Sequence, residues 1–419
     1  MSFMPDNKRK NSPRAVIDRL YRAAIASDCA VAIWRCPTQS TPHALVDCRW
    51  SLDAEMPALA SSAKGFVFSP FWKGHDASFC FLKGDFHTDT MGRMHRVPGV
   101  PDSAPIARFD KAFSRFEHPL SPGPCWFIGT PYSSGLDVAQ DIFCEWVQKA
   151  VQEIHRDTFT KVVLSRPAEV ELAGSFEPQA LFYELCRAYQ NAFVSLVALP
   201  GVGTWIGATP ELLLSLDNRQ LATVSLAGTK SFQAELNGQN IIWGKKEQVE
   251  QEIVSDYIRA CFESHGIYDF FEHPLETVRI GNLLHLQTKF TRHLQTTTPE
   301  EITSFLTSLH PTPAVCGVPK EQALKFIEAN EICKRQYYSG YLGPVDFNDC
   351  TRLYVNLRCL QLHEDTATLY AGCGITKDSV PEKEWLETQL KLGALLKYLK
   401  VEYSGLASEE ILSTSALLR

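Results

Sequence analysis

The sequence lacks an excess of basic residues, and this limits its partners. Its 419 residues include 41 Lys and Arg against 48 Asp and Glu, which gives a formal net charge of −7. No basic stripe and no charged tail stands out. Binding to a nucleic-acid backbone depends on clustered Lys and Arg side chains. We therefore expect no nucleic-acid partner.

Long apolar runs are missing as well. The chain has no stretch of about 18 consecutive apolar residues, the length that a membrane-spanning helix needs. The polar segment 1–14 is not followed by the apolar core of a signal peptide. We expect a cytoplasmic protein without membrane contact, with residues 1–14 as a disordered N-terminus.

Paired cysteines are also absent, although cysteine itself is not. The chain has 13 cysteines, an odd number, and none of them forms a Cys-x-x-Cys pair. A disulfide framework or a structural zinc site shows regular pairing, so the pattern favours neither and indicates a reducing compartment. A Walker loop is missing too, which removes the usual nucleotide-binding interpretation.

Short strand-like runs separated by turn residues dominate the chain. Their close spacing around Trp205, Leu213 and Thr223 predicts antiparallel hairpins, because parallel neighbours need a crossover of about a dozen residues. A helix over 136–157 leads into a more regular region. We predict an α/β body with residues 15–145 as its N-terminal part, 146–400 as the catalytic core and 401–419 as a tail. The expected strands are 30–34, 65–68, 78–82, 125–129, 160–165, 193–199, 203–207, 212–216, 221–225, 352–361 and 366–373.

The segment 244–266 is predicted to form a helix, which ends where Gly266 can adopt a left-handed conformation. Its apolar side chains recur at helical spacing. Glu247 and Glu250 are three residues apart, so they share a face away from the centre of the apolar stripe. The positions of that stripe are Val249, Ile253, Tyr257 and Cys261.

A second helix is predicted to begin near residue 379, where Ser379 and Glu382 have the form of a capping box. Glu384, Glu387 and Lys391 follow i, i+3, i+7 spacing and share a face. Mg²⁺ prefers oxygen ligands and usually takes one or two protein carboxylates, so one glutamate from each helix would suit it. On spacing alone, such glutamates are more typical of a solvated surface. The apolar positions of this helix are Leu386, Leu390 and Leu395.

Eight motifs together resemble the chorismate-utilising enzymes, a family that includes isochorismate, salicylate, anthranilate and aminodeoxychorismate synthases. They follow the family's order over roughly residues 145–400. The resemblance implies one large domain with two stacked antiparallel sheets flanked by helices, in which 146–400 binds chorismate. The motifs are Lys161–Arg166 (KVVLSR), Ile206–Leu213 (IGATPELL), Leu226–Thr229 (LAGT), Leu309–Gly317 (LHPTPAVCG), Tyr338–Gly340 (YSG), Asn356–Cys359 (NLRC), Ala371–Gly374 (AGCG) and Glu384–Thr388 (EWLET).

The resemblance also implies the catalytic residues. Converting chorismate to isochorismate adds water at C2 while hydroxide leaves from C4, which needs a base and an acid. By resemblance, Lys161 is the base and Glu211 is the acid. A free carboxyl group would be ionised at neutral pH, but the apolar neighbours of Glu211 would raise its pKa by desolvation. Without the resemblance, Lys161 at the start of a strand would be interpreted as a surface lysine.

The metal and substrate contacts are implied in the same way. Glu250 and Glu384 would bind Mg²⁺ directly, with Glu247 and Glu387 holding metal-bound water or acting as further ligands. The ion would clamp the ring carboxylate. The family's common Glu-His pair is Glu250-Gln251 here. The implied substrate-binding residues are Arg358, Tyr338 and Gly372 for the enolpyruvyl carboxylate, Gly228, Thr229 and Lys391 for the ring carboxylate, and His285 and Ala314 beside the ring.

Three positions separate the reactions of the family. Ammonia-using members typically carry glutamine where this chain has Lys161, so the lysine indicates water as nucleophile and no glutaminase subunit. Ala227 replaces the lysine of aminodeoxychorismate synthases, and Ala314 a threonine often present in salicylate synthases. The sequence thus favours an isochorismate synthase, monomeric or homodimeric, of menaquinone or siderophore biosynthesis. A salicylate synthase, anthranilate synthase component I and a non-catalytic chorismate-binding protein are the alternatives.

Overall fold

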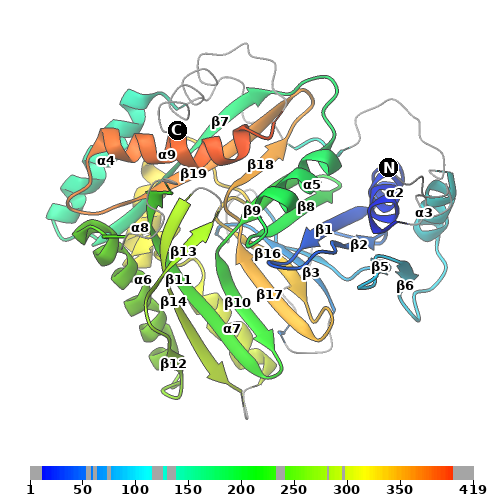
Figure 1. Cartoon of the computed structure of the whole chain (residues 1–419), viewed down its shortest axis with the longest axis horizontal. Helices are drawn as coiled ribbons and strands as arrows, with labels where there is room; N and C mark the ends of the chain where they lie inside the picture. Colours follow the sequence, from blue (N-terminus) through cyan, green and yellow to red (C-terminus); the bar gives the residue numbers. More distant parts are fainter. Residues whose placement is uncertain are drawn as a thin grey trace.

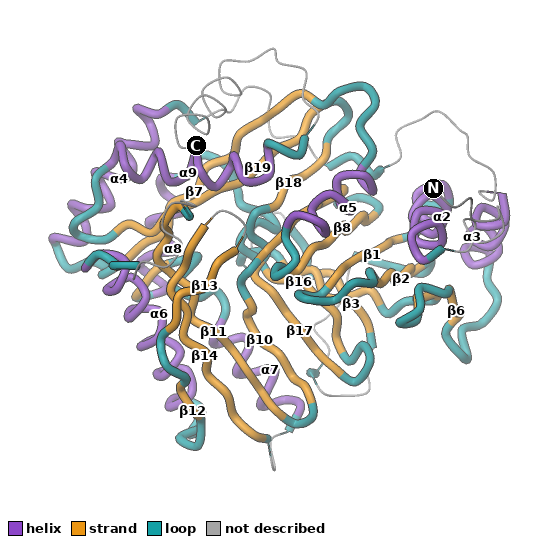
Figure 2. Tube along the Cα trace, viewed as in Figure 1, coloured by secondary structure: helices purple, strands orange, loops and turns teal. Residues whose placement is uncertain are grey.

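The computed structural model describes residues 12–52, 58–59, 64–72, 77–115, 126–129, 138–232, 241–280, 283–294 and 298–399. In this part of the chain, two large antiparallel sheets lie in the middle and helices lie outside them (Figures 1 and 2). This is the predicted fold class.

The first sheet has ten strands in the order β15-β7-β19-β18-β9-β8-β1-β2-β5-β6. Its longest ladder joins β7 to β19, from Glu171 opposite Thr366 to Val162 opposite Ile375. The strands are β1 (Ala30–Arg35), β2 (His43–Asp47), β5 (Phe86–Thr88), β6 (Met94–Arg96), β7 (Lys161–Glu171), β8 (Phe193–Leu199), β9 (Gly203–Thr209), β15 (Gly317–Val318), β18 (Cys359–Leu362) and β19 (Thr366–Ile375).

The second sheet has nine strands in the order β12-β14-β11-β10-β17-β16-β3-β4, with β13 paired to β14. Strands from residues 15–145 therefore enter both sheets. The strands are β3 (Gly65–Ser69), β4 (Cys80–Leu82), β10 (Leu212–Asp217), β11 (Gln220–Ser231), β12 (Phe271–Glu272), β13 (Glu276–Ile280), β14 (Leu283–His293), β16 (Tyr341–Val345) and β17 (Cys350–Val355).

The helices cover the outer faces of the sheets. α9 and α4 lie over β7 and β19, and α6 packs on β11 and β14.

No helix in the described ranges is both long and apolar enough to cross a membrane. α2 begins at Pro13, inside the segment expected to be disordered, whereas 1–11 and the predicted tail 401–419 lie outside the described residues. The helices are α2 (Pro13–Ala26), α3 (Ala104–Arg115), α4 (Gln140–His155), α5 (Pro178–Ala188), α6 (Lys245–Ser264), α7 (Pro299–Leu309), α8 (Lys320–Asn330) and α9 (Pro381–Leu396).

Aromatic side chains from the two sheets interlock between them. Phe193 of β8 stacks on Tyr354 of β17 with ring centroids 4.3 Å apart, and Trp34 of β1 lies 5.1 Å from Phe66 of β3. Large buried rings contribute both area and specific geometry to a core. This inter-sheet core fixes the two sheets relative to each other, and with them the residues at their junction.

Two strand predictions were wrong. The segment 352–361 is not one strand, because β17 ends at Val355 in one sheet and β18 begins at Cys359 in the other. The chain changes sheets at Arg358, whose φ of +47° lies in the left-handed region. No glycine or proline marks this break. Residues 126–129 form a loop, since the Phe127 amide bonds the Thr204 hydroxyl instead of a ladder partner; Cys125 lies outside the described residues.

The predicted apolar stripe of α6 was wrong at its first position, whereas Cys261 at its other end is buried. Val249 is 43% exposed, whereas Gln251 and Ser255 face the sheet and are buried. Polar residues can occupy this face because they are hydrogen-bonded: Gln251 Nε2 donates to Ser225 Oγ at 2.7 Å, and that hydroxyl lies 2.9 Å from Ser255 Oγ. Gln251 thus holds α6 on β11.

α9 departs from its predicted pattern at Leu386, whereas Leu395 is buried as predicted. Leu386 is 45% exposed, whereas Glu384 and Thr388 are buried. The buried polar face is again satisfied, since Arg166 Nε donates to Thr388 Oγ1 at 2.8 Å. The helix is not capped by Ser379 as predicted, because Val380 is the N-cap and the Ser379 hydroxyl accepts the Thr376 amide instead.

Candidate active site

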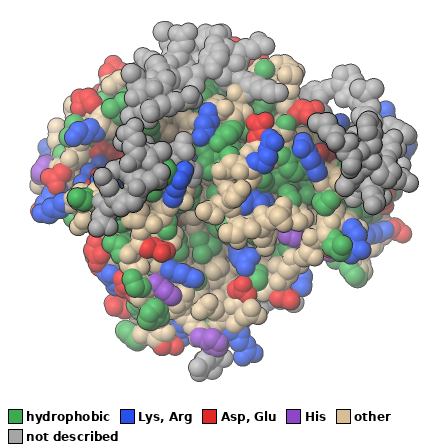
Figure 3. Space-filling view, viewed as in Figure 1, with side chains coloured by type: hydrophobic (Ala, Val, Ile, Leu, Met, Phe, Trp, Pro, Cys, Tyr) green, Lys and Arg blue, Asp and Glu red, His purple; other side chains and the backbone are tan. Residues whose placement is uncertain are grey.

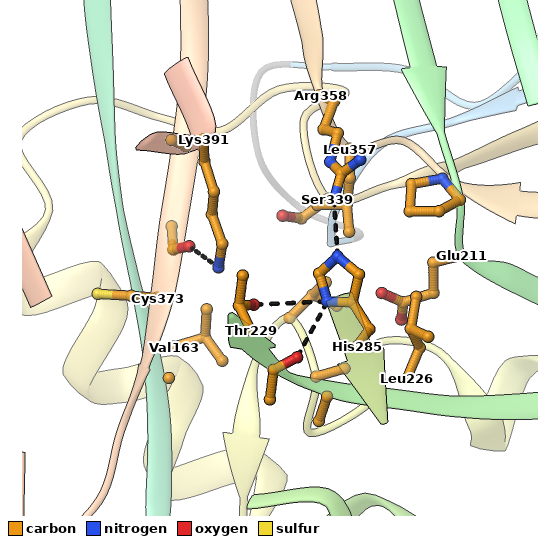
Figure 4. Close-up of a pocket in the computed structure, with 18 of the residues that line it drawn as sticks. Val163, Glu211, Leu226, Thr229, His285, Ser339, Leu357, Arg358, Cys373 and Lys391 are labelled. Atoms are coloured by element: carbon orange, nitrogen blue, oxygen red, sulfur yellow. Dashed lines mark hydrogen bonds between the residues drawn. The ribbon is translucent and has the colours of Figure 1, made fainter. Parts of the chain in front are cut away.

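A pocket lies where the ends of both sheets meet α6 and α9, and Figure 4 shows its lining (Figure 4). Strands β7, β11, β14 and β19 contribute, together with the sheet-crossing segment that contains Arg358. The pocket brings together residues that are far apart in sequence. Ten of the predicted site residues line it: Glu211, Gly228, Thr229, Glu250, His285, Ala314, Tyr338, Arg358, Gly372 and Lys391.

Lys161 opens β7 and is fully buried, with 0% of its surface exposed. Its Nζ lies 3.1 Å from Glu250 Oε1, an oxygen of a pocket-lining residue. Gly374 makes room for both, because a Cβ there would lie 2.9 Å from Lys161 Cε and 2.3 Å from Glu250 Oε1. Interpreting Lys161 as a surface lysine is therefore excluded.

Glu211 lies in the connection between β9 and β10 and is 5% exposed. Burial raises the pKa of its carboxyl group to about 7, although Lys161, Lys391 and Arg358 act in the opposite direction. The direction and cause agree with the prediction from its apolar neighbours. At neutral pH, a large fraction of this carboxyl group is protonated and able to donate a proton.

Arg358 and His285 form a hydrogen-bonded pair on one wall. Arg358 NH2 lies 2.8 Å from His285 Nε2, and His285 Nδ1 lies 3.0 Å from the Gly228 carbonyl oxygen. Because arginine only donates, Nε2 accepts and Nδ1 carries the proton. Burial, Arg358 and Lys391 lower the pKa of His285 to about 3, which is consistent with this neutral form. The histidine orients the guanidinium toward the pocket.

Lys391 enters from α9, where Figure 4 places it across the pocket from Glu211. Its Nζ donates to the Gly372 carbonyl oxygen and to Glu387 Oε1, both at 2.8 Å. Burial alone would lower the pKa of this amine, but Glu387 outweighs it and the pKa is raised, so the ammonium persists. Tyr338 stacks on Tyr370 at 5.3 Å, and burial raises the pKa of its phenol, which keeps it a neutral donor.

The carboxylates of α6 and α9 converge on Lys246, a residue that sequence reasoning missed. Its ammonium contacts Glu384, which is 1% exposed. Burial lowers the pKa of Lys246, but Glu384, Glu387 and Glu250 together raise it. Its spacing in the sequence could have pointed to it, because Lys246 lies four residues before Glu250 and therefore on the same face of α6.

Burial, together with Glu387, raises the pKa of Glu384 despite the opposing effect of Lys246. At Glu250 the net effect is the opposite. Burial favours its neutral form, yet Lys161, Lys246 and Lys391 lower its pKa and keep it ionised. Glu247 is not brought into the pocket. Its Cβ packs against Gly228, and its carboxylate turns back toward Gly244 at the start of α6.

The carboxylates of Glu250 and Glu384 meet some of the requirements of a divalent-cation site. The described residues contain no group of three or more His, Cys, Asp and Glu side chains placed to hold a metal ion. However, Glu384 Oε2 is buried without a hydrogen-bond partner within those residues, and a buried carboxylate oxygen of this kind calls for a cation. Mg²⁺ needs only one or two protein carboxylates. Glu250 and Glu384 satisfy that requirement, with lysine ammonium groups balancing their charge.

Lysine and arginine side chains are interspersed with aspartate and glutamate over the face of the molecule shown in Figure 3 (Figure 3). The uncertain segments, drawn in grey, cover part of this view. At the pocket, in contrast, charges of both signs are paired: Glu250 contacts the buried Lys161, Lys391 contacts Glu387, and the buried Glu384 contacts the half-buried Lys246.

The chain is similar in sequence to several isochorismate synthases. The chain is 28% identical over 262 residues to the isochorismate synthase EntC of Escherichia coli, covering 61% of this chain and 66% of EntC. It is 32% identical over 399 residues to the salicylate biosynthesis isochorismate synthase of Pseudomonas aeruginosa, covering 87% and 82%. The aligned part thus spans about two thirds of EntC and most of the Pseudomonas protein.

The fold has solved counterparts. The menaquinone-specific isochorismate synthase MenF of Escherichia coli superposes with a TM-score of 0.70 at 21% identity, over 91% of both chains. Residues 130–400 match the family described as chorismate binding enzymes. Together with the pocket described above, this match shows that the chain belongs to the chorismate-binding enzyme family.

Proposed function

We propose that this protein is a Mg²⁺-dependent isochorismate synthase. One observation carries the proposal: a buried glutamate with a pKa of about 7 lines the pocket, and a fully buried lysine lies behind that lining, 3.1 Å from the pocket-lining Glu250. A base and an acid in one site are what the addition of water and the loss of hydroxide require. The names of the relatives from Escherichia coli and Pseudomonas aeruginosa support the same reaction.

The substrate carries two carboxylates, and the pocket offers cations for both. Arg358, which is bonded to His285, would bind the enolpyruvyl carboxylate with help from the Tyr338 hydroxyl. Lys391 and the Gly228–Thr229 segment serve the ring carboxylate. Gly228 has φ of +68°, and a Cβ there would lie 3.0 Å from Glu247 Cβ, so a side chain at this position would be strained. Binding at two ends fixes the ring between the acid and the base.

The chemical step transfers two protons. Lys161 takes a proton from the water that attacks C2, the ring double bond shifts, and the C4 hydroxyl leaves as water with the proton of Glu211. Solvent then returns a proton to Glu211 and removes one from Lys161. A Mg²⁺ ion held by Glu250 and Glu384 would neutralise the ring carboxylate and compete with Lys161 for Glu250.

The test is to incubate the purified protein with chorismate and Mg²⁺ and to identify the products. Isochorismate as the only product supports the proposal. Salicylate with pyruvate would instead indicate a salicylate synthase, and anthranilate formed with ammonium an anthranilate synthase component I. Unchanged chorismate would indicate a non-catalytic chorismate-binding protein.

The metal assignment makes a separate prediction. In Glu250→Gln and Glu384→Gln, we expect the Mg²⁺ concentration for half-maximal activity to rise by about tenfold or more, because each ligand loses its charge. Glu382→Gln is the matched control, since Glu382 lies in the first turn of α9 and is exposed. Titration of activity with Mg²⁺, together with calorimetric titration of the metal, measures the effect. Unchanged metal dependence in both variants would remove the proposed site.

A further inference from the structure

On the side of β7 that faces away from β19, a neighbouring strand pairs with only the first residues of β7. β15 pairs only with Lys161 and Val162, and the next contact is the Val163 amide, which donates to the Cys316 carbonyl at 2.7 Å. In a strand, the N–H and C=O groups of one residue point to the same edge. The Val163 carbonyl and the Ser165 amide therefore face the edge where β15 no longer reaches.

Two side chains take the place of the missing strand. Arg335 donates from NH2 to the Val163 carbonyl at 2.7 Å. Glu331 Oε1 accepts the Ser165 amide at 2.7 Å, and its Oε2 accepts the Ser165 hydroxyl at 3.1 Å. A guanidinium group supplies donors and a carboxylate supplies acceptors. The pair thus completes the hydrogen bonding of β7 as a neighbouring strand would.

The same pair also holds the neighbouring part of the pocket wall. Arg335 NH1 donates to the Val315 carbonyl at 2.7 Å, and both Val315 and its neighbour Ala314 line the pocket. One guanidinium group therefore joins the strand of Lys161 to the Ala314–Val315 wall. Only a planar, multi-donor group can make these bonds together with a two-point contact to Glu331.

The ion pair is deeply buried. The side chains of Arg335 and Glu331 are 3% and 4% exposed, and they meet through two contacts of 2.5 Å and 2.9 Å. A buried ion pair is weak evidence for stability, because desolvation offsets much of its attraction. Neither residue lines the pocket, and neither is among the residues that the proposed reaction uses.

We propose that Glu331 and Arg335 are positioning residues that hold Lys161 and the Ala314–Val315 wall in register, which rests on the proposed function. Lys161 lies two residues before Val163 on β7, so a shift of this edge moves the base directly. The groups that bind the carboxylates, Arg358 and Lys391, come from other elements. Loss of the pair should therefore impair the chemical step more than substrate binding.

The test compares Glu331→Gln and Arg335→Lys with the wild type in steady-state kinetics on chorismate. We expect kcat to fall by between about tenfold and hundredfold, the loss typical of a base misplaced by about 1 Å, while KM changes by less than about threefold. Glu321→Gln is the matched control, because Glu321 pairs with Lys325 at the same i, i+4 spacing on α8 but is exposed. This variant should retain wild-type kcat.

Ser165→Ala keeps the test decisive where a buried-charge variant fails to fold. It removes only the hydroxyl contact with Glu331 and keeps the backbone bond, so we expect kcat alone to fall by a few fold. Wild-type kcat in the folded variants would overturn the inference, and so would a loss of kcat matched by an equal rise in KM. A wild-type protein that leaves chorismate unchanged would instead refute the proposed function, and this inference with it.

Discussion

Replacing Lys161 with alanine should nearly abolish turnover of chorismate, with kcat falling by roughly 10²- to 10⁴-fold, the usual contribution of a general base. The lysine is fully buried beside Glu250 and has no well-aligned hydrogen bond within the described residues. The lysine and arginine that line the pocket do not replace the Lys161 amine, because Lys391 is already bonded to Gly372 and Glu387, and Arg358 to His285.

The Lys161→Ala prediction separates catalysis from binding. Lys161 is not part of the pocket lining, so the affinity for chorismate, measured by calorimetric titration, should change by only a few fold. Thermal unfolding should be measured as well, because the variant leaves Glu250 without this partner. Lys325→Ala, at an exposed lysine of α8, is the control. A near-normal kcat in Lys161→Ala would show that the base is a different group.

Much of the fold follows from local pattern. Strands such as β8 and β9 combine β-branched and aromatic residues with clear turn residues at their ends, so their positions could be predicted. The break between β17 and β18 could not, because Asn356–Arg358 contains no glycine or proline and its direction is set by two sheets that the local sequence does not describe. The exposed fraction of Arg358 and its place at the sheet junction depend on that break.

The faces of α6 and α9 show a second limit. Hydrophobic spacing assigned Val249 and Leu386 to the interior, yet both are exposed and polar residues replace them. Whether Gln251 or Thr388 can be buried depends on partners such as Ser225 and Arg166, which lie on distant strands. Spacing alone therefore could not place Glu250 and Glu384, and the family motifs were needed to single them out.

Lys246 and the Glu331–Arg335 pair were missed for a related reason. Each acts through a contact between elements that are distant in sequence: Lys246 meets Glu384 of α9, and Glu331 meets Ser165 of β7. A lysine near a helix start and an i, i+4 ion pair have an ordinary surface interpretation in sequence. The structure distinguishes them from Lys325 and Glu321, which have the same spacing and are exposed, because Glu331 and Arg335 are buried and Lys246 contacts the buried Glu384.

Replacing Glu211 with glutamine should lower kcat by roughly 10²- to 10⁴-fold, because the amide cannot protonate the departing hydroxyl. The geometry of the side chain is preserved, so chorismate should still bind. Glu364→Gln is a suitable control, since Glu364 is exposed after β18. Measurements at saturating Mg²⁺ separate this loss from any change in metal affinity.

The pH dependence gives this prediction its sharpest form. The pKa of Glu211 is raised to about 7 by burial, so the acid is protonated below that pH and loses its proton as the pH rises through it. Because kcat/KM reports the ionisation of the free enzyme, the wild-type value should decline above about pH 7, where the ionised form predominates. The residual activity of Glu211→Gln should lack this decline, since no proton remains to be lost there. A wild-type kcat/KM that stays level through pH 8, or a variant that keeps the same alkaline limb, would assign the acid to another group at the pocket.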